Sequence, residues 1–209
     1  MASSSPWPTI HTERAALADD LQELTDAQWL ERSLCARWSV RDVLAHMTAT
    51  AKMTPGAFLG KLAGSGFRFN TMTANGIAAE TVGTPAQSLA QFRAQQSSTK
   101  HPPGPTVTWL GETIVHAEDI RRPLGIHHAY PTAAVVQLAE FYSRSNALIG
   151  SKKRITGLRL AATDADWSAG SGPEVSGPVL SLVLAMTGRG AALSDLTGPG
   201  VDTLRSRAG

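Results

Sequence analysis

The chain has 209 residues, a formal net charge of +2 and a hydrophobic fraction of 42%. This length suits one large domain, or one domain with a small companion. The charge is too small to indicate a nucleic-acid partner. No apolar stretch reaches the roughly 18 residues of a membrane span, and the N-terminus lacks the pattern of a secretory signal. We therefore expect neither membrane nor nucleic acid as a partner.

Cys35 is the only cysteine in the chain. A single cysteine excludes an intrachain disulfide and a metal site built from several thiolates. We interpret Cys35 as a small hydrophobic residue in apolar surroundings. A chain without disulfides also fits a reducing compartment, so we expect a cytoplasmic location.

The first predicted helix ends near residue 24, on an apolar stripe formed by Ile10, Leu17, Leu21 and Leu24. A second helix is expected to begin at Ser39, a favourable N-cap residue, with Asp42 three residues later as in a capping box. It should end by Pro55-Gly56.

Five glycines between residues 56 and 84 weaken any helix prediction there, although a helix over about 70–80 fits the pattern. Thr84-Pro85 marks the start of a helix that should run to about residue 97. After a proline-rich connector at 101–105, a further helix is expected over 107–122, ending before Pro123.

Another helix should begin at Thr132, and the pattern changes after Gly150. A strand is expected over 157–163, a short extended piece over 166–168 and a helix over 179–186, with turns between 170 and 178. We therefore predict an α+β protein of two domains. Residues 1–151 should form a bundle of four to five helices, and residues 152–209 a small α/β domain.

Three residues on the flanks of two predicted helices form a candidate metal site. Glu112 and His116 lie one turn apart, so both side chains can reach one ion. His46 lies on the flank of the helix that begins at Ser39, and facing helices of a bundle commonly build such sites. Two imidazoles and one carboxylate form a ligand set that binds zinc and leaves a coordination position open. Asp119 continues the same edge and could orient a ligand imidazole.

The spacing alone leaves another interpretation open. A glutamate and a histidine four residues apart also occur by chance on solvated helix faces. Four further histidines are present, His11, His101, His127 and His128, of which the last two follow Gly125 in a predicted surface loop.

Two segments carry a resemblance to known proteins. Residues 38–47, WSVRDVLAHM, resemble the W-s-v-r-d-v-l-a-H-l motif of the DinB-like superfamily. Residues 111–125, GETIVHAEDIRRPLG, resemble the E-x-x-x-H-x-x-D-x-r-x-x-L-G segment of the mycothiol-dependent maleylpyruvate isomerase family. Residues 172–178 and 187–189 are similar to that family's small C-terminal domain.

The resemblance implies a DinB-like bundle that binds a divalent metal, usually zinc, through His46, Glu112 and His116. Nickel stays open, because imidazole and carboxylate accept both ions. It also implies mycothiol as a thiol cosubstrate, activated as thiolate for isomerisation or S-transfer on a small electrophile. Arg189 matches a Gly-Arg pair of the family and is our candidate for holding a carboxylate of thiol or substrate.

The alternative is a non-catalytic bundle that binds a metal or another ligand. The Arg121-Arg122-Pro123 ending resembles uncharacterised actinobacterial members of the family more than the isomerases themselves, so the substrate stays open. We expect a monomer or a homodimer.

Overall fold

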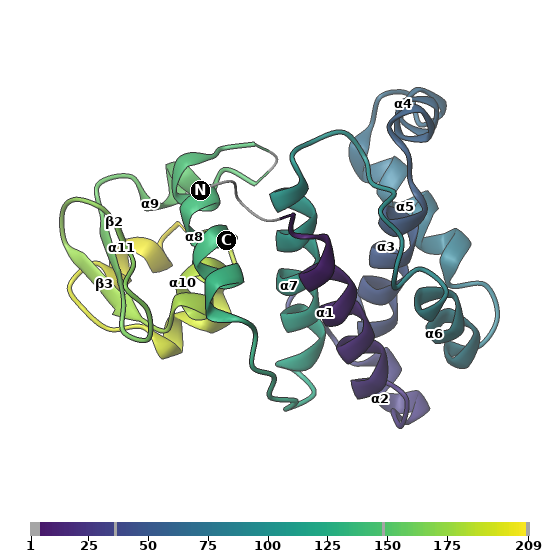
Figure 1. The fold of residues 1–209 in the computed structure, drawn as a ribbon, viewed down its shortest axis with the longest axis horizontal. Helices are drawn as coiled ribbons and strands as arrows, with labels where there is room; N and C mark the ends of the chain where they lie inside the picture. Colours follow the sequence, from purple (N-terminus) through teal and green to yellow (C-terminus); the bar gives the residue numbers. More distant parts are fainter. Residues whose placement is uncertain (1–4, 36, 148, 208–209) are drawn as a thin grey trace. The chain divides into compact units, whose positions relative to one another are not determined.

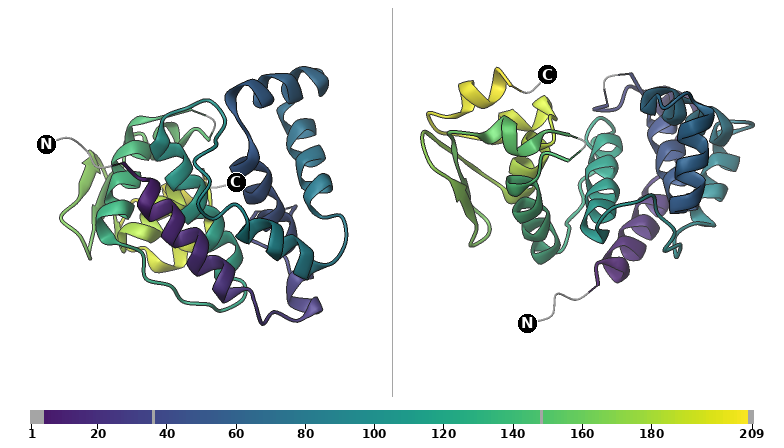
Figure 2. Two further views of the ribbon diagram at one scale, coloured as in Figure 1. Left: turned by 45° about the vertical axis from the view of Figure 1, so that its right-hand side comes forward. Right: turned by 90° about the horizontal axis from the view of Figure 1, so that it is seen from above.

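The computed structural model describes residues 5–35, 37–147 and 149–207, and its ribbon is drawn in Figures 1 and 2. Residues 1–4 and 208–209, at the ends of the two predicted domains, lie outside this description. The chain forms two compact units, residues 1–128 and 129–209. The domain boundary expected after residue 151 stays a prediction. The two compact units instead divide after residue 128, because helix α8 (Thr132–Arg144) packs against α10 (Val179–Met186). Among the described residues, no helix combines the length and hydropathy that crossing a membrane requires.

Four helices enclose the main core of unit 1 (Figure 2). They are α1 (Trp7–Asp20), α3 (Val40–Lys52), α6 (Pro85–Arg93) and α7 (Thr106–Arg121). Their apolar stripes meet in one cluster that includes Leu17, Leu21, Val43, Leu44, Met47, Phe92, Ala117 and Ile120. These are the stripes that the helical periodicity predicts, so the helical bundle is confirmed.

The start of α3 is fixed by the predicted capping box. The Ser39 hydroxyl accepts from the Asp42 N–H at 3.2 Å, and the Ser39 N–H donates to the Asp42 carboxylate at 2.9 Å. These two bonds satisfy backbone donors that a helix start leaves free. They also set the register of α3, and with it the direction in which His46 points.

Two helix ends differ from the prediction. Helix α1 stops at Asp20 rather than near residue 24, and a short helix α2 (Asp26–Leu30) follows. Thr25 and Gln28 form a capping box that starts α2, although Leu24 still packs against the core. Helix α6 ends at Arg93, before the expected residue 97.

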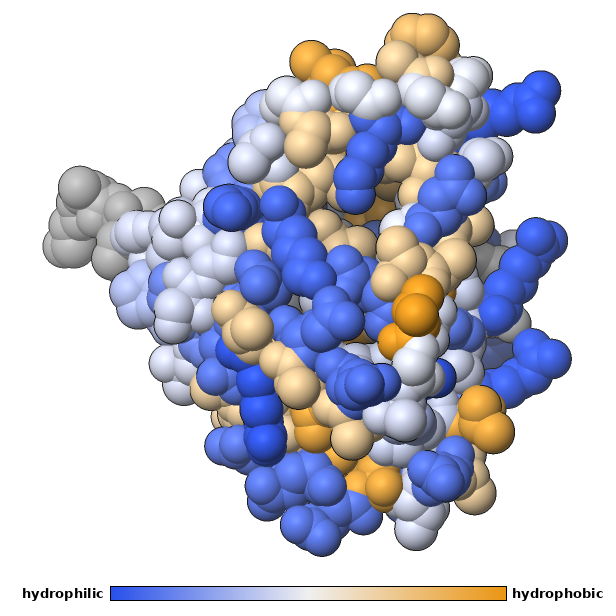
Figure 3. Space-filling view, turned by 90° about the vertical axis from the view of Figure 1, so that its right-hand side faces the viewer, coloured by the Kyte–Doolittle hydropathy of each residue, from blue (hydrophilic) through white to orange (hydrophobic). Residues whose placement is uncertain are grey.

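The glycine-rich segment folds as a helical hairpin. Helix α4 (Pro55–Gly64) starts where the hydroxyl of Thr54 accepts from the Ala57 N–H, and α5 (Phe69–Glu80) covers the helix expected over 70–80. The glycines weaken the helix prediction over this segment, yet a helix forms at 55–64, because an N-cap threonine followed by proline outweighs the glycine cost. Helix α4 has no buried residue, and Leu59 and Phe67 are largely exposed. Figure 3 shows apolar surface at this end of unit 1.

Unit 2 contains a three-stranded sheet of order β2-β1-β3, covered by the apolar helix α10. The strands are β1 (Arg159–Ala162), β2 (Ser168–Gly170) and β3 (Glu174–Gly177). β1 pairs antiparallel with β2 and parallel with β3, with Leu160 opposite Ala169 and Val175. The shorter elements are α9 (Ser151–Ile155), a 3-10 helix (Gly190–Asp195) and α11 (Val201–Arg205).

The strand near 157–163 and the helix over 179–186 are confirmed, whereas β3 falls in a stretch that we expect to be turns. Packing explains why β3 ends in a glycine, Gly177, and the sequence does not show this packing. A Cβ on Gly177 would lie 2.6 Å from a methyl carbon of Leu196 and 2.8 Å from the Asp195 carbonyl oxygen. The strand therefore needs glycine where two backbones approach.

Candidate metal centre

The two predicted histidine ligands meet between α3 and α7, which pack against each other. The ring centroids of His46 and His116 lie 5.0 Å apart, with the planes at 83°. The Trp38 ring lies 4.9 Å from His46 and 6.2 Å from His116. The structure thus brings together His46 and His116, which the sequence separates by 70 positions, on the faces where the helical wheel puts them.

Glu112 lies one turn before His116, with its carboxylate in the interior. Both carboxylate oxygens are buried, and neither has a hydrogen-bond partner among the described residues. Burial raises the pKa of Glu112, while the positive charge of Arg14, the nearby His116 and the Thr113 hydroxyl oppose this rise. The Thr113 hydroxyl donates to the Trp109 carbonyl oxygen at 2.9 Å, so it does not satisfy the carboxylate. A buried carboxylate without hydrogen bonds is costly, and buried charges are normally paired or coordinate a metal. The Glu112 carboxylate is therefore an acceptor suited to a cation.

Arg14 supplies positive charge near Glu112 without binding it. Its guanidinium is fully buried on α1, and one of its terminal nitrogens donates to the carbonyl oxygen of Ser98 at 3.0 Å and, more weakly, to that of Gln95. Burial lowers the pKa of Arg14, and Glu112 opposes this shift. Sequence reasoning missed Arg14, because nothing in the helical pattern of α1 distinguishes a buried arginine from one at the surface.

His46 is held in its neutral form. Burial, followed by the neighbouring His116, lowers the pKa of His46 to about 3, although Asp119 opposes the shift. An imidazole must be neutral to ligate a metal, because a protonated ring offers no lone pair. His46 is therefore in a ligand-competent state at neutral pH.

Asp119 contacts the His116 ring at Nδ1. His116 Nδ1 lies 2.8 Å from Asp119 Oδ2, and the Cys35 sulfur donates to the same oxygen at 3.0 Å. Asp119 is completely buried. An ionised carboxylate can only accept, so the proton of a neutral His116 lies on Nδ1 and the lone pair on Nε2. This is the arrangement of a carboxylate that orients a metal-binding histidine, which is the role we predict for Asp119.

Among the described residues, Cys35, His116 and Asp119 form a group that could hold an ion, because one ligand atom from each lies within 4.8 Å of the others. Two donors on one tetrahedral zinc ion stand about 3.3–3.5 Å apart, given bonds of about 2.0–2.3 Å. The observed separations from Asp119 Oδ2, 2.8 Å to nitrogen and 3.0 Å to sulfur, are shorter and match hydrogen bonds. We therefore interpret this group as a hydrogen-bonded support.

Sequence reasoning missed this position of Cys35. The residue does pack against the core cluster, as a small hydrophobic residue would, but it also belongs to the candidate site. The contact joins residues 84 positions apart, between a loop and a helix, and no local pattern reports it.

The three predicted ligands have the donor types of a divalent metal site, but among the described residues the ligand atoms that all lie within 4.8 Å of one another are those of Cys35, His116 and Asp119, not those of the predicted set. His46 and His116 offer imidazole nitrogens and Glu112 offers a carboxylate without partners, which together suit zinc or nickel.

Two other histidines are explained by their surroundings. His127 is exposed, as expected for a surface loop. His128 is only partly exposed, and its Nε2 lies 2.7 Å from the buried carboxylate of Glu13. The surface interpretation is thus incomplete for His128, because α1 supplies a partner that the local sequence does not show.

Arg189 lies in unit 2, just after α10. Its Nη1 donates to the Thr187 carbonyl oxygen at 2.9 Å. Arg154 donates to the Met186 carbonyl oxygen at 2.6 Å, and its pKa is lowered by burial and by the charge of Arg189. Two neighbouring guanidinium groups favour an anion. Carboxylate binding by Arg189 stays a prediction.

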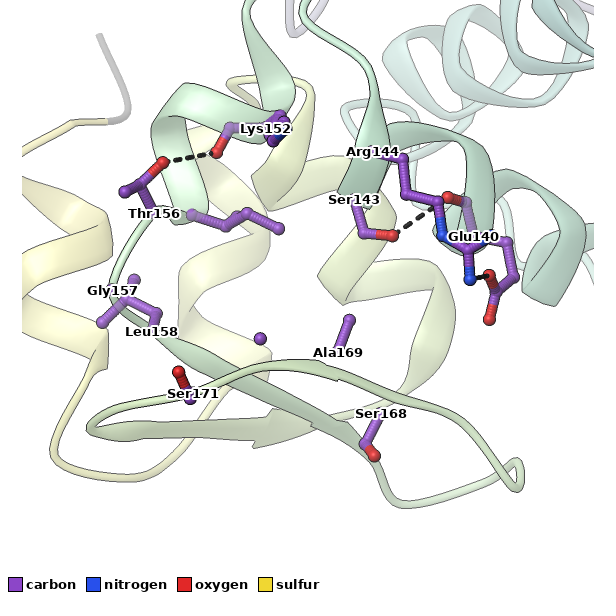
Figure 4. Close-up of a pocket in the computed structure, with 12 residues that line it drawn as sticks. Glu140, Ser143, Arg144, Lys152, Thr156, Gly157, Leu158, Ser168, Ala169 and Ser171 are labelled. Carbon is purple, nitrogen blue, oxygen red and sulfur yellow. Dashed lines mark hydrogen bonds and ion pairs between the residues drawn. The ribbon is translucent and has the colours of Figure 1, made fainter.

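Unit 2 also has a pocket of about 440 Å³ between α8, α9 and the β1–β2 strands (Figure 4). Its polar lining includes Glu140, Ser143, Arg144, Lys152, Ser168 and Ser171. Glu140 pairs with Arg144 at 2.6 Å and accepts from the Trp167 indole at 3.1 Å. The one carboxylate of this lining is thus already bonded, so the pocket has no metal-ligand set.

Part of the first unit is similar to a known protein family. Residues 10–101 match the family model of the mycothiol maleylpyruvate isomerase N-terminal domain. This part of the chain includes His46, whereas Glu112 and His116 lie beyond it. No curated protein matches the chain.

Two solved structures share the fold of the whole chain. One is the mycothiol-dependent maleylpyruvate isomerase, at 17% identity and a TM-score of 0.65. The other is a histidine-to-alanine mutant of the mycothiol-dependent maleylpyruvate isomerase, at 16% identity and a TM-score of 0.64. Each alignment covers 92% of this chain and 91% of the other. The predicted fold, a DinB-like bundle followed by a small α/β domain, is confirmed.

Proposed function

Since residues 10–101 belong to the N-terminal domain family of the mycothiol-dependent maleylpyruvate isomerases, we propose that the protein is a metal-dependent enzyme of thiol chemistry. It would use a low-molecular-weight thiol of the mycothiol type to isomerise or S-conjugate a small electrophile. The observation that carries the proposal is the buried carboxylate of Glu112, which has no hydrogen-bond partner beside two facing histidines.

His46, Glu112 and His116 would hold the ion, zinc or nickel. When bound, a divalent ion lowers the pKa of a coordinated thiol enough to keep it as thiolate. Neighbouring side chains and burial would orient the imidazole ligands or keep them neutral. Asp119 keeps the His116 proton on Nδ1, and burial keeps His46 neutral. Trp38 packs against the His46 ring and restricts its rotation.

A thiolate is a strong nucleophile at neutral pH. Added to a cis double bond conjugated to a carbonyl group, it permits rotation about the resulting single bond, and its departure gives the trans isomer. If it stays attached, the product is an S-conjugate. We propose that Arg189 binds a carboxylate of the thiol or of the substrate, since guanidinium matches carboxylate geometry. The cytoplasm, which keeps small thiols reduced, is the compartment we propose.

The first test is metal content after purification without a histidine tag. We expect close to one equivalent of zinc or nickel in the wild-type protein and less than about a tenth in His46→Ala. His127→Ala is the matched control, because that histidine is exposed, and it should keep the metal. A wild-type protein without metal, or a His46→Ala protein that retains it, would contradict the proposal.

The second test asks whether the metal serves catalysis. The metal-loaded protein is incubated with mycothiol and a panel of electrophiles, including cis-configured unsaturated diacids, and products are followed by mass spectrometry and absorbance. Turnover that disappears in His46→Ala supports an enzyme.

A non-catalytic metal-binding bundle is the second candidate. It is favoured by one observation, that all three donors come from α3 and α7 of unit 1. Metal binding without turnover across the panel, with Arg189→Ala behaving as wild type, would support that candidate instead.

A further inference from the structure

The loop between α2 and α3 is tightly bonded to the end of α7. The Leu34 N–H donates to the Asp119 carbonyl oxygen at 3.1 Å. Within the loop, the Ser33 hydroxyl donates to the Trp38 carbonyl oxygen at 2.8 Å, and the Trp38 N–H donates to that of Cys35 at 2.8 Å. These bonds fix the positions from which Cys35 and Trp38 reach the two histidines.

Cys35 acts on His116 through Asp119. One oxygen, Asp119 Oδ2, accepts both the thiol at 3.0 Å and His116 Nδ1 at 2.8 Å. The thiol therefore helps to hold the carboxylate in the rotamer that binds the imidazole. Cys35 Sγ is 3.8 Å from His116 Nδ1, so the sulfur lies on the side of the ring that carries the proton.

We propose that Cys35 is a positioning residue of the metal centre, which fixes the Asp119 carboxylate and thereby the His116 nitrogen that faces the ion. Trp38, from the same loop, restricts the ring of His46. The loop thus orients both histidine ligands while contributing no ligand itself. This inference rests on the proposed metal site.

The test compares Cys35→Ala with Cys35→Ser in the full chain, with Co²⁺ as the spectroscopic probe and Zn²⁺ affinity measured by chelator competition. Serine keeps a donor to Asp119, whereas alanine removes it. We expect a 10–100-fold loss of Zn²⁺ affinity in Cys35→Ala, the usual cost of losing a partner that orients a ligand. Cys35→Ser should stay within a few-fold of wild type.

Two results would overturn the proposal. Equal affinities for wild type, Cys35→Ala and Cys35→Ser would show that the hydrogen bond does not matter. A thiolate-to-cobalt absorption band in wild type that vanishes in Cys35→Ser would show that Cys35 is a ligand.

A second measurement separates this inference from the metal site itself. In metal-free protein, the nitrogen-15 shifts of His116 report which ring nitrogen carries the proton. We expect the Nδ1–H form in wild type and Cys35→Ser, and a mixture of both forms in Cys35→Ala. If wild type binds no metal, the proposed function fails while this measurement still decides the role of Cys35. An unchanged His116 tautomer in Cys35→Ala would refute the positioning role of Cys35.

Discussion

Two buried carboxylates near His116, those of Asp119 and Glu112, differ in whether they accept hydrogen bonds. On the Nδ1 side, Asp119 accepts from both His116 and Cys35 and is fully buried. On the other side, Glu112 is buried with no hydrogen-bond partner among the described residues. Bonds within the fold satisfy the first carboxylate, whereas the second has none of this kind. We therefore predict that Asp119 supports the proposed site and that Glu112 is a ligand.

The largest effect is expected from Glu112→Gln, which removes the unsatisfied charge. We expect Zn²⁺ affinity to fall by more than the roughly 100-fold that loss of a supporting partner can cost. The stability of the metal-free protein should change little, because removing a buried carboxylate that has no hydrogen bond offsets the loss of its attraction to the buried Arg14. Chelator competition and urea unfolding measure the two quantities, and Glu23→Gln, at an exposed residue, is the control. A metal-free Glu112→Gln protein that is clearly destabilised would break the comparison.

Asp119→Asn should behave in the opposite way. A neutral amide oxygen is a weaker acceptor than a carboxylate oxygen, so both hydrogen bonds to this position weaken, and we expect the metal-free protein to lose about 1–3 kcal/mol of stability. Zn²⁺ affinity should also fall, by about 10–100-fold. Asp19→Asn, at an exposed carboxylate, serves as the control in the same unfolding experiments. Unchanged stability of metal-free Asp119→Asn would show that the Nδ1 side is not a preformed support.

A smaller effect is expected from pH on metal-free protein. The unfolded chain protonates His46 near pH 6.5, whereas the folded chain does so only near pH 3. Stability is therefore lost as pH falls below about 6.5. Between pH 7.5 and 5, His46 should account for about 2 kcal/mol, at 1.36 kcal/mol per pKa unit.

Urea unfolding of wild type and His46→Leu at both pH values isolates this contribution, because every other group titrates in both proteins. The difference in stability between the two proteins should shift in favour of His46→Leu at pH 5. A difference independent of pH would mean that folding does not lower the pKa of His46.

Helical spacing placed Glu112 and His116 on one face of a helix, whereas the choice of His46 among six histidines also depended on the resemblance to a known family. Glu112 and His116 are one turn apart, and the Ser39 capping box fixes the register of His46. That such residues lie close together in space follows from packing two amphipathic helices along their apolar stripes.

Other features were outside the reach of the sequence, because they depend on contacts between distant segments. Cys35 meets Asp119 through a loop whose path no periodicity reports. Arg14 is buried on a helix whose apolar and polar faces are weakly separated, and β3 exists because Gly177 permits a close backbone contact. The α4 helix was missed for a local reason, since one cap and one proline outweighed three glycines.

Helix α4 has a thermodynamic consequence of its own. Because it buries none of its residues and contacts α5 without entering the core, it adds little apolar burial to the folding free energy. Segments of this kind open at a cost well below that of global unfolding. Residues 55–64 should therefore exchange their amide hydrogens through local opening, while α3 and α7 exchange only when the bundle itself unfolds. We therefore expect the candidate site and the α4–α5 hairpin to lie in one unit of the chain but in two different cooperative units of folding.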